Sequence, residues 1–383
     1  MDSRGFPTSL PEFQRVFPND PACARYLEKM RWPGGFTCSK CGRGGEPYRF
    51  PSRSSVVLRC RDCKKNTSLT SGTVMQSTHT PLSTWFWGAY LVTTQTPGQS
   101  ALQFQRQLGL SRYETAFQIL HKLRAGMVRP EREGIGGPYT VEVDECFVGG
   151  RAKTHALSQQ NKAVVVGAVE LRVRADAEER FVKHRQKHGR GAPQKKLVYA
   201  GRLRLRVAPD RGLGLLGFIK ENIIAGSRVR TAALPSYKSL PTLGYEHQRL
   251  TLEGDPEKAE AHLPMIHLVF SNLKTWILGT HHGAIRHQHL QAYLNEYVYR
   301  FNRRFHPMTA FNSVLGLAAH STSPTYEELY SGVWVHPAGA ARSAGSLPSE
   351  SHRPGQTCGA SEEAVLPVAA PQSFLDSSTP KIP

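Results

Sequence analysis

Apolar and polar residues alternate along residues 140–150, and this alternation, followed by two glycines, predicts a short strand that ends in a tight turn. Val141 and Val143 alternate with Glu142 and Asp144. Carboxylates are costly to bury in a strand unless a positive charge meets them. A divalent cation would do so, since hard cations prefer oxygen ligands. The same pattern also fits an edge strand whose acids face water, and this stretch alone leaves both interpretations open.

Three more stretches have the pattern of strands, at 162–170, 201–207 and 227–233, and residues 215–224 have helical periodicity. Two longer helices follow, each with an apolar stripe. The stripes are Ile266, Val269, Phe270, Leu273, Trp276 and Ile277, and then Leu290, Tyr293, Leu294, Tyr297, Val298 and Phe301. We assign an α/β domain to residues 138–310. It carries a basic insertion at 174–196, which is either a phosphate-binding loop or a solvated hairpin tip.

Residues 1–37 contain a short helical lead-in, and two Cys-x-x-Cys turns follow, eighteen residues apart. The four cysteines are Cys38, Cys41, Cys60 and Cys63. Each turn can aim two thiolates at one ion, so the pair predicts a structural Zn²⁺ site in a zinc ribbon over residues 38–66. Two disulfides or four idle thiols are the competing interpretation, which a reducing compartment disfavours.

Residues 67–130 are predicted to be helical, with apolar residues at helical spacing from Trp85 to Leu91. Two short helices joined at Leu-Gly-Leu-Ser111 have the pattern of a helix-turn-helix, with Ser111 as the N-cap of the second helix. Four cations are expected to face outward, namely Arg106, Arg112, Lys122 and Arg124. An ordinary helical hairpin with solvated charges fits the same pattern equally well.

Charge points to a polyanionic partner. The 383 residues include 49 Lys and Arg against 30 Asp and Glu, a net charge of +19, which favours nucleic acid. The sequence shows neither an apolar run long enough to span a bilayer nor a signal pattern, which predicts a protein inside the cell without a membrane partner. Residues 331–383 are rich in Ser, Pro, Ala and Gly without periodicity, so we predict that they are disordered.

The order of these parts, together with six short motifs, resembles the IS1595-type insertion-sequence transposases, the group with an ISXO2-like transposase domain in the DDE superfamily. The motifs are Arg31-Trp-Pro-Gly-Gly-Phe-Thr-Cys38-Ser-Lys-Cys41, Leu69-Thr-Ser-Gly-Thr73, Leu108-Gly-Leu-Ser-Arg-Tyr-Glu-Thr-Ala116, Val143-Asp-Glu145 with Gly149-Gly150, Leu278-Gly-Thr-His-His-Gly283 and Phe301-Asn-Arg-Arg304. The resemblance covers roughly residues 8–330.

The resemblance implies a multidomain α/β protein in which the zinc ribbon and helix-turn-helix precede an RNase H-like mixed-sheet core. It also implies cutting and joining of DNA strands with two catalytic Mg²⁺ or Mn²⁺ ions. The implied partners are terminal inverted repeats, target DNA and further copies of the chain. The implied location is the bacterial cytoplasm, in association with the nucleoid.

By family position, Asp144 is the first catalytic acid and a Mg²⁺ ligand, and His267 with Lys274 occupies the third position, where Asn272 is a weaker candidate. Without the resemblance, His267 would be interpreted as a polar residue on a half-buried helix. At the second position the family reads Thr-Asp-Gly and an aromatic, then Tyr, whereas this chain reads Thr231-Ala-Ala-Leu-Pro-Ser-Tyr237. Ala232 therefore stands where the second Asp is expected.

Alanine cannot bind a metal, so we expect this copy to bind DNA but to catalyse poorly. Three other acids (Asp210, Glu253 and Asp255) do not lie at the predicted strand end and are not expected to replace the missing one. The predicted DNA contacts are Arg112, Lys122, Arg124, Lys274, Arg300, Arg303 and Arg304. A repressor or inactive subunit that binds DNA without cutting is the main alternative. An RNA-binding zinc-ribbon protein would leave Asp144 unexplained.

Overall fold

The computed structural model describes residues 7, 9–52, 55–96, 98–128, 133–149, 162–173, 198–209, 212–250, 262–282, 285–320 and 324–331. The predicted basic insertion lies outside these residues, as do the predicted disordered tail beyond Ser331 and the three acids Asp210, Glu253 and Asp255. Among the helices described, none is long and apolar enough to cross a bilayer.

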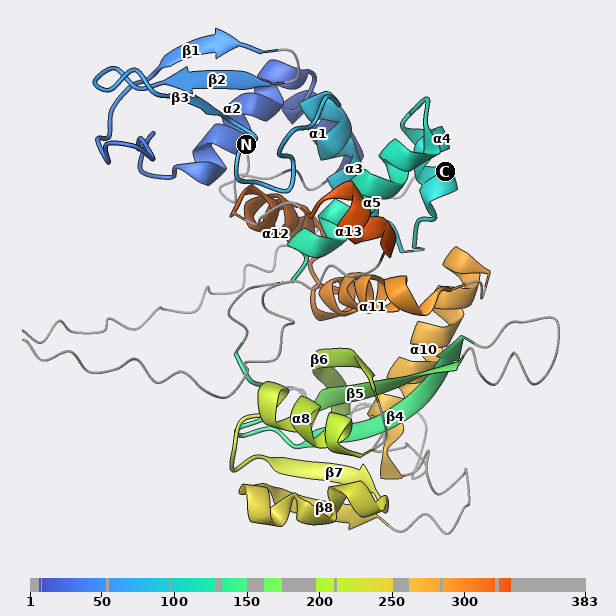
Figure 1. The fold of residues 1–383 in the computed structure, drawn as a ribbon. Coiled ribbons are helices and arrows are strands. Elements are labelled where there is room, and N and C mark those ends of the chain that lie inside the picture. The colour runs from blue at the N-terminus through green and yellow to red at the C-terminus, as the bar shows by residue number, and fades with distance from the viewer. Residues whose placement is uncertain are drawn as a thin grey trace, which may run out of the picture. The chain divides into compact units, whose positions relative to one another are not determined.

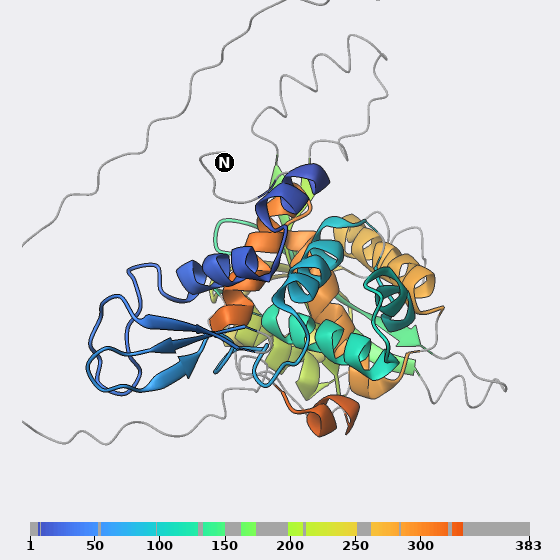
Figure 2. The same cartoon turned by 90° about the horizontal axis from the view of Figure 1, so that it is seen from above.

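Two capped helices open the chain: α1 (Leu10–Val16) and α2 (Asp20–Arg31). The side chains of Ser9 and Asn19 accept hydrogen bonds from the first turns of these helices, which satisfies backbone donors that have no intrahelical partner. The zinc ribbon follows as an antiparallel sheet of β1 (Tyr48–Pro51), β2 (Val56–Arg59) and β3 (Asn66–Ser68), drawn in blue in Figures 1 and 2.

The helical region consists of α3 (Leu82–Thr94), α4 (Ala101–Gln107) and α5 (Tyr113–Gly126). Gly109 takes φ +61° in the turn between α4 and α5, a conformation that favours glycine. The prediction that Ser111 caps α5 is wrong, because the N-cap residue is Arg112 and no side chain caps the helix. Two helices that were not predicted end the described chain: α12 (Pro307–His320) and α13 (Tyr326–Ser331).

The helices α3, α4, α5 and α12 share one apolar core with the N-terminal pair. Phe13 of α1, Leu27 of α2, Phe86 of α3, Leu120 of α5 and Phe311 of α12 are all fully buried in the same cluster. The last part of the chain therefore packs on the first part. We infer that α12 belongs structurally with the N-terminal helices.

The predicted mixed sheet is confirmed. Its strands are β4 (Val141–Gly149), β5 (Lys162–Val173), β6 (Val198–Ala208), β7 (Arg228–Ala232) and β8 (Glu246–Leu250), in the order β6-β5-β4-β7-β8. The pairs β4–β5 and β5–β6 are antiparallel, while β4–β7 and β7–β8 are parallel. Because β4 lies at the centre, the interpretation of residues 140–150 as an edge strand with solvated acids is wrong. β8 was not predicted.

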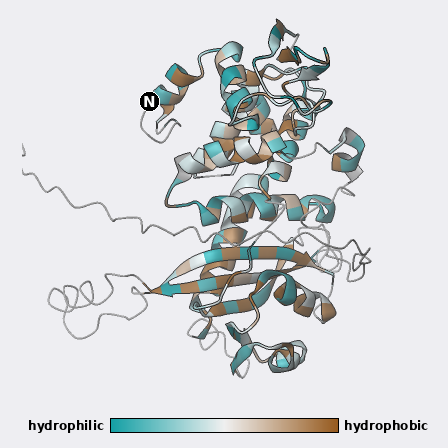
Figure 3. Cartoon of the chain, turned by 90° about the vertical axis from the view of Figure 1, so that its left-hand side faces the viewer, coloured by the Kyte–Doolittle hydropathy of each residue, from teal (hydrophilic) through white to brown (hydrophobic). Residues whose placement is uncertain are grey.

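Helices cover both faces of this sheet (Figure 1). The helix α8 (Leu213–Asn222) and the 3-10 helix η2 (Pro235–Ser239) pack on one face. The helices α10 (Pro264–His281) and α11 (His287–Asn302) pack on the other. Figure 3 shows hydrophobic and hydrophilic residues interspersed along both the strands and the helices. The predicted apolar stripes are the surfaces that α10 and α11 bury.

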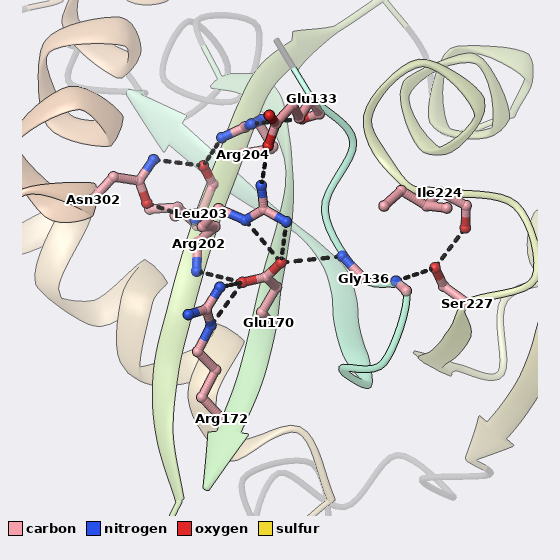
Figure 4. Close-up of polar contacts among 11 residues, drawn as sticks. Glu133, Gly136, Glu170, Arg172, Arg202, Leu203, Arg204, Ile224, Ser227 and Asn302 are labelled. Atoms are coloured by element: carbon pink, nitrogen blue, oxygen red, sulfur yellow. Dashed lines mark hydrogen bonds and ion pairs between the residues drawn. The ribbon is translucent and has the colours of Figure 1, made fainter. Parts of the chain in front are cut away.

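Side chains of α11 and of the turn after it bind the outer backbone of β6, an edge strand. Asn302 accepts a hydrogen bond from the Leu203 N–H at 2.7 Å and donates one to the Leu203 carbonyl at 3.1 Å (Figure 4). Gln291 accepts from the Val207 N–H at 2.9 Å, and Arg304 donates to the carbonyl of Ala200. An uncovered edge strand invites pairing with other chains, so the Asn302 contacts protect this edge.

A buried carboxylate ties the segment before β4 to the sheet (Figure 4). Glu170 of β5 is fully buried and accepts hydrogen bonds from Arg202 at 2.9 Å, Arg172 at 3.1 Å and the Gly136 N–H at 3.2 Å. Gly136 takes φ +100°, and an added Cβ would meet Ser227 Oγ at 2.4 Å, so glycine is required there. The hydrogen bond from Gly136 to Glu170 holds the segment that leads into β4 against the sheet.

Candidate active site and metal centre

The structure brings two of the predicted catalytic residues together. Asp144 lies on β4 and His267 lies on the second turn of α10, with His267 Nε2 3.2 Å from Asp144 Oδ2. The Asp144 side chain is 14% exposed and the His267 side chain 32% exposed, so both are partly open to solvent. The pair lies on the face of the sheet that α10 covers.

Glu142 anchors the helix that carries His267. Its carboxylate is fully buried, and Oε2 accepts hydrogen bonds at 2.9 Å from the backbone N–H groups of Met265 and Ile266. Since the first N–H groups of a helix have no intrahelical partner, Glu142 caps α10 from a neighbouring strand. Burial raises the pKa of Glu142 to about 7, although these two amide donors act to lower it. The sequence showed the acid but not this role.

Ala232 occupies the neighbouring strand position beside Asp144. The strands β4 and β7 are parallel, with Val143 opposite Thr231. One further step along this register places Ala232 next to Asp144, and Ala232 packs against the apolar cluster on the α10 side. The predicted site of the second acid is therefore geometrically present, but it carries a methyl group.

These residues do not fit a pair of divalent cations. Two cations need carboxylates from more than one strand to hold them. In the part of the chain that the structure describes, the group of three or more ligating side chains close enough to share an ion is the four-cysteine cluster, and Asp144 belongs to no such group. Lys274 lies on α10 two turns beyond His267, and its side chain is exposed. The side chain of Asn272, the weaker candidate, is also exposed. The geometry supports an acid–imidazole pair at this site.

The tyrosine expected after the second acid position has a structural contact. Tyr237 is fully buried in η2, and its hydroxyl donates a hydrogen bond to Oε2 of Glu145 at 3.2 Å. Glu145 follows Asp144 on β4 and points to the opposite face of the sheet. This bond ties the segment after β7 to the strand that carries Asp144.

The four predicted cysteine ligands converge. Their sulfur atoms all lie within 4.8 Å of one another, with Cys38 Sγ 3.5 Å from Cys63 Sγ and Cys41 Sγ 3.7 Å from Cys60 Sγ. None of them forms a disulfide. A tetrahedral zinc with bonds of about 2.3 Å would separate its sulfurs by about 3.8 Å. Backbone N–H groups of Cys41 and Lys40 lower the pKa of Cys38 to about 6, which favours the thiolate that zinc requires. These residues fit a structural zinc ion.

We expect one zinc ion per chain, and its removal should unfold the ribbon. Among the described residues, the buried apolar core of the ribbon consists of Phe36, Cys38, Leu58 and Cys60, so little else holds the ribbon together. Metal analysis of the Cys60→Ser variant should show loss of the ion, with protease sensitivity appearing near the ribbon. Cys23→Ala, which changes a buried cysteine outside the ribbon, should keep it. Full zinc content in Cys60→Ser would contradict the assignment.

The predicted DNA-binding cations of the helical region differ in their exposure to solvent. Arg112 is exposed at the start of α5, as predicted, and Lys122 is half-buried. The prediction that Arg124 faces outward is wrong: it is 2% exposed. Its Nε donates to Glu296 Oε2 of α11 at 2.7 Å, and its guanidinium lies 4.7 Å from the Tyr293 ring centroid. Arg124 therefore joins α5 to α11 in the interior and cannot reach DNA phosphate.

The cations at the end of α11 also have internal contacts. Arg300 pairs with Glu296 at 3.2 Å and donates to the Thr96 carbonyl at 2.7 Å. Arg303 lies 3.9 Å from the Tyr299 ring centroid, and Arg304 lies 4.1 Å from that of Phe301. Contact of the three arginines with DNA stays a prediction, to which the structure adds an intramolecular role for each.

Glu296 shows which signal in the sequence could have revealed this interior network. It lies on the apolar stripe of α11, between Leu294 and Tyr297, and is 1% exposed. A carboxylate on a buried stripe needs a cation within reach. That rule predicts a buried partner for Glu296, although it does not say which arginine provides it.

Three histidines gather beside this ion pair. His281 of α10 and His121 of α5 lie beside Tyr293, with ring centroids 4.1 Å and 5.8 Å from that of Tyr293, and His289 of α11 lies 5.1 Å from His121. Burial and the nearby Arg124 lower the pKa of His281 to about 3. Burial and Arg124 also lower the pKa values of His121 and His289. The cluster is therefore neutral at pH 7.

Acidification should destabilise the protein through His281. Its pKa is lowered from 6.5 to about 3 by folding, so the unfolded chain binds more protons between these values and the free energy of unfolding falls as pH drops through that window. The loss at pH 5 should be about 1 to 2 kcal/mol after allowance for partial solvent screening. Thermal unfolding between pH 7 and 5 should show a weaker pH dependence for His281→Gln, whereas exposed His306→Gln should behave like the unmodified protein. An equal pH dependence of the unmodified protein and both variants would contradict the assigned role of His281.

Two protein-family models match the chain. The ISXO2-like transposase domain matches residues 135–302, and the transposase zinc-ribbon domain matches residues 18–66. A curated relative, the "Uncharacterized protein in transposable element ISH50" of Halobacterium salinarum, is 26% identical over 150 residues. This match covers 39% of the chain and 49% of the relative, so the chain spans about half the length of the curated protein that it matches. No solved structure matches. The matched domains contain the Asp144 pair and the four-cysteine cluster.

Proposed function

Because this chain belongs to the IS1595 family of insertion-sequence transposases, we propose that it binds the terminal inverted repeats of its own element and target DNA. It acts as a homo-oligomer on the DNA of a bacterial nucleoid, with structural zinc in the ribbon. The net charge of +19 supports a nucleic-acid partner. The exposed Arg112 and Lys274 are its proposed DNA contacts in the helical region and at the catalytic face.

We further propose that this copy is catalytically impaired. The observation that carries the proposal is the position of Ala232, one register step beyond the Val143–Thr231 pair and so beside Asp144. Clamping the attacking and leaving oxygens of a phosphoryl transfer takes carboxylates from neighbouring strands. One carboxylate that lies 3.2 Å from an imidazole supplies a single anionic group. Loss of the shared carboxylate should remove several kcal/mol of transition-state stabilisation.

The remaining groups at the site have defined roles in this proposal. Asp144 holds the His267 ring through their 3.2 Å contact. Glu142 keeps His267 in place by capping α10 at the preceding two residues. Exposed Lys274 offers a cation to DNA phosphate on the same side of the helix. The protein thus binds and orients DNA at a site whose second acid is absent.

A DNA-binding subunit without catalysis is the second candidate function. The four zinc ligands and the α4–α5 pair are retained while the second acid is lost, a combination that suits a repressor or an inactive partner of an active transposase. Both candidates predict zinc and DNA binding. They differ in whether restoring the second acid, in the Ala232→Asp variant, restores strand cleavage.

Binding and cleavage of the element's terminal DNA test the proposal. The unmodified protein should shift terminal DNA in a mobility assay, with RNA competing poorly, and should show no cleavage above background in magnesium or manganese. Absence of DNA binding would remove the proposed function. Turnover at rates usual for an active transposase would remove the proposed impairment.

A further inference from the structure

The outward face of the zinc-ribbon sheet carries two exposed aromatic rings. Tyr48 and Phe50 are alternate residues of β1 and therefore share a face, and each is 44% exposed. Arg49 lies between them and points to the other side, where it pairs with Glu28 of α2 at 2.7 Å. The buried core of the ribbon does not include either ring.

Three cations lie on these rings. The guanidinium of Arg61 is 4.8 Å from the Tyr48 ring centroid, and that of Arg59 is 5.4 Å from the Phe50 centroid. The Nζ of Lys64 lies 5.7 Å from the Tyr48 centroid. The register of β1 and β2 pairs Tyr48 with Arg59, which places them on one side of the sheet. Such contacts hold long cationic side chains in place at an exposed surface.

The charges of these cations are available to a partner. Their hydrogen bonds go to uncharged oxygens, from Arg59 to Asn66 at 2.8 Å, from Arg61 to the Glu46 carbonyl at 2.7 Å and from Lys64 to the Arg61 carbonyl at 2.6 Å. Within the described residues, none of the three forms an ion pair. The ribbon as a whole, residues 38–66, has eight Lys and Arg against two acids. This excess of positive charge is larger than the negative charge that four thiolates would contribute.

We propose that this surface, formed by Tyr48, Phe50, Arg59, Arg61 and Lys64 and called the ribbon face, is a DNA contact surface. The inference rests on the proposed function and adds which side of the ribbon meets the DNA. The cations contact phosphates, and the rings pack against a sugar or an unpaired base. Interleaved cations and aromatic rings are the combination that binds a nucleic-acid strand.

The positive charge of the ribbon face favours DNA over an apolar protein surface as its partner. An apolar protein surface would leave three cations desolvated without compensation, whereas each DNA phosphate that a cation meets releases a counterion. Pre-positioned guanidinium groups also lose less side-chain freedom on binding. The ribbon face therefore fits a regular array of phosphates.

The salt dependence of DNA affinity tests the inference. In the triple variant Arg59→Gln, Arg61→Gln and Lys64→Gln, the slope of log affinity against log salt should fall by about 2 to 3. The control triple variant Arg15→Gln, Lys220→Gln and Lys238→Gln removes three exposed cations elsewhere and should leave the slope unchanged. The double variant Tyr48→Ala and Phe50→Ala should weaken binding roughly tenfold with little change of slope.

The outcomes separate this inference from the proposed function. If the unmodified protein does not bind DNA, both fail. If it binds DNA and the triple variant, with full zinc content, keeps the slope and affinity of the control, the ribbon face is not a DNA contact although the proposed function stands. Should the triple variant lose zinc, the single variant Arg61→Gln decides, with an expected reduction in slope of about 1.

Discussion

Replacing Ala232 by aspartate is expected to raise magnesium-dependent cleavage of the element's terminal DNA by at least about a hundredfold over the unmodified protein. The register of β4 and β7 places the new carboxylate beside Asp144. Two carboxylates from neighbouring strands could then hold a cation that one carboxylate cannot. Cleavage should be measured on labelled terminal DNA with magnesium, with manganese and with chelator.

Two matched variants control for other effects of this substitution. The Ala232→Asn variant carries a side chain nearly the same size as that of Ala232→Asp but without its negative charge, and it should not gain activity. The double variant Ala232→Asp with Asp144→Asn should lose the gain, because the paired carboxylate is gone. Cleavage by the unmodified protein at the rate of the Ala232→Asp variant would show that another group supplies the second acid. No cleavage by any variant that still binds DNA would favour the DNA-binding subunit.

Magnesium should also stabilise the Ala232→Asp variant more than the unmodified protein. Without a cation, two adjacent carboxylates repel each other, so the substitution should lower the thermal midpoint. A bound ion stabilises the folded state by mass action, and the deficit should shrink as magnesium is added. This binding readout is independent of DNA cleavage.

Breaking the buried ion pair between α5 and α11 should cost about 3 to 5 kcal/mol. Arg124 and Glu296 have side chains only 3% and 1% exposed, and Arg300 shares the same carboxylate. Glu296→Ala would leave Arg124 buried without its anion and would remove one partner of Arg300. A fall of roughly 10 °C in the thermal midpoint is expected, with earlier proteolysis between the helical region and the sheet.

Removal of both buried partners should be milder than removal of one. The double variant Arg124→Met with Glu296→Leu leaves no unpaired charge at position 124, and apolar replacement of a buried pair is often close to neutral. Arg300 still loses Glu296 in this variant but keeps its hydrogen bond to the Thr96 carbonyl. Glu114→Ala, an exposed carboxylate on the same α5 helix, should change stability little. If Glu296→Ala is no less stable than Glu114→Ala, the pair does not hold the two regions together.

Local pattern was sufficient for the elements of secondary structure that have strong periodicity. The four strands predicted at 140–150, 162–170, 201–207 and 227–233 are β4 to β7, and the two late apolar stripes are those of α10 and α11. The short strand β8 was missed because its burial is intermediate and its sequence, Glu-His-Gln-Arg-Leu, has little apolar alternation. The helix α12 was also not predicted, and it packs on helices at the other end of the chain.

The sequence by itself predicted that the four cysteines share a site, because Cys-x-x-Cys spacing is a local property, and their sulfur atoms do converge. Through its resemblance to a family it also predicted a shared site for Asp144 and His267, which lie 3.2 Å apart. Tertiary structure alone decided the roles of the buried charges. The partner of Glu142 lies 123 residues away and that of Arg124 lies 172 residues away. A periodic pattern can show that a charge lies on a buried face, but only the packing of distant elements selects its partner, since that choice depends on which helix ends and strands meet.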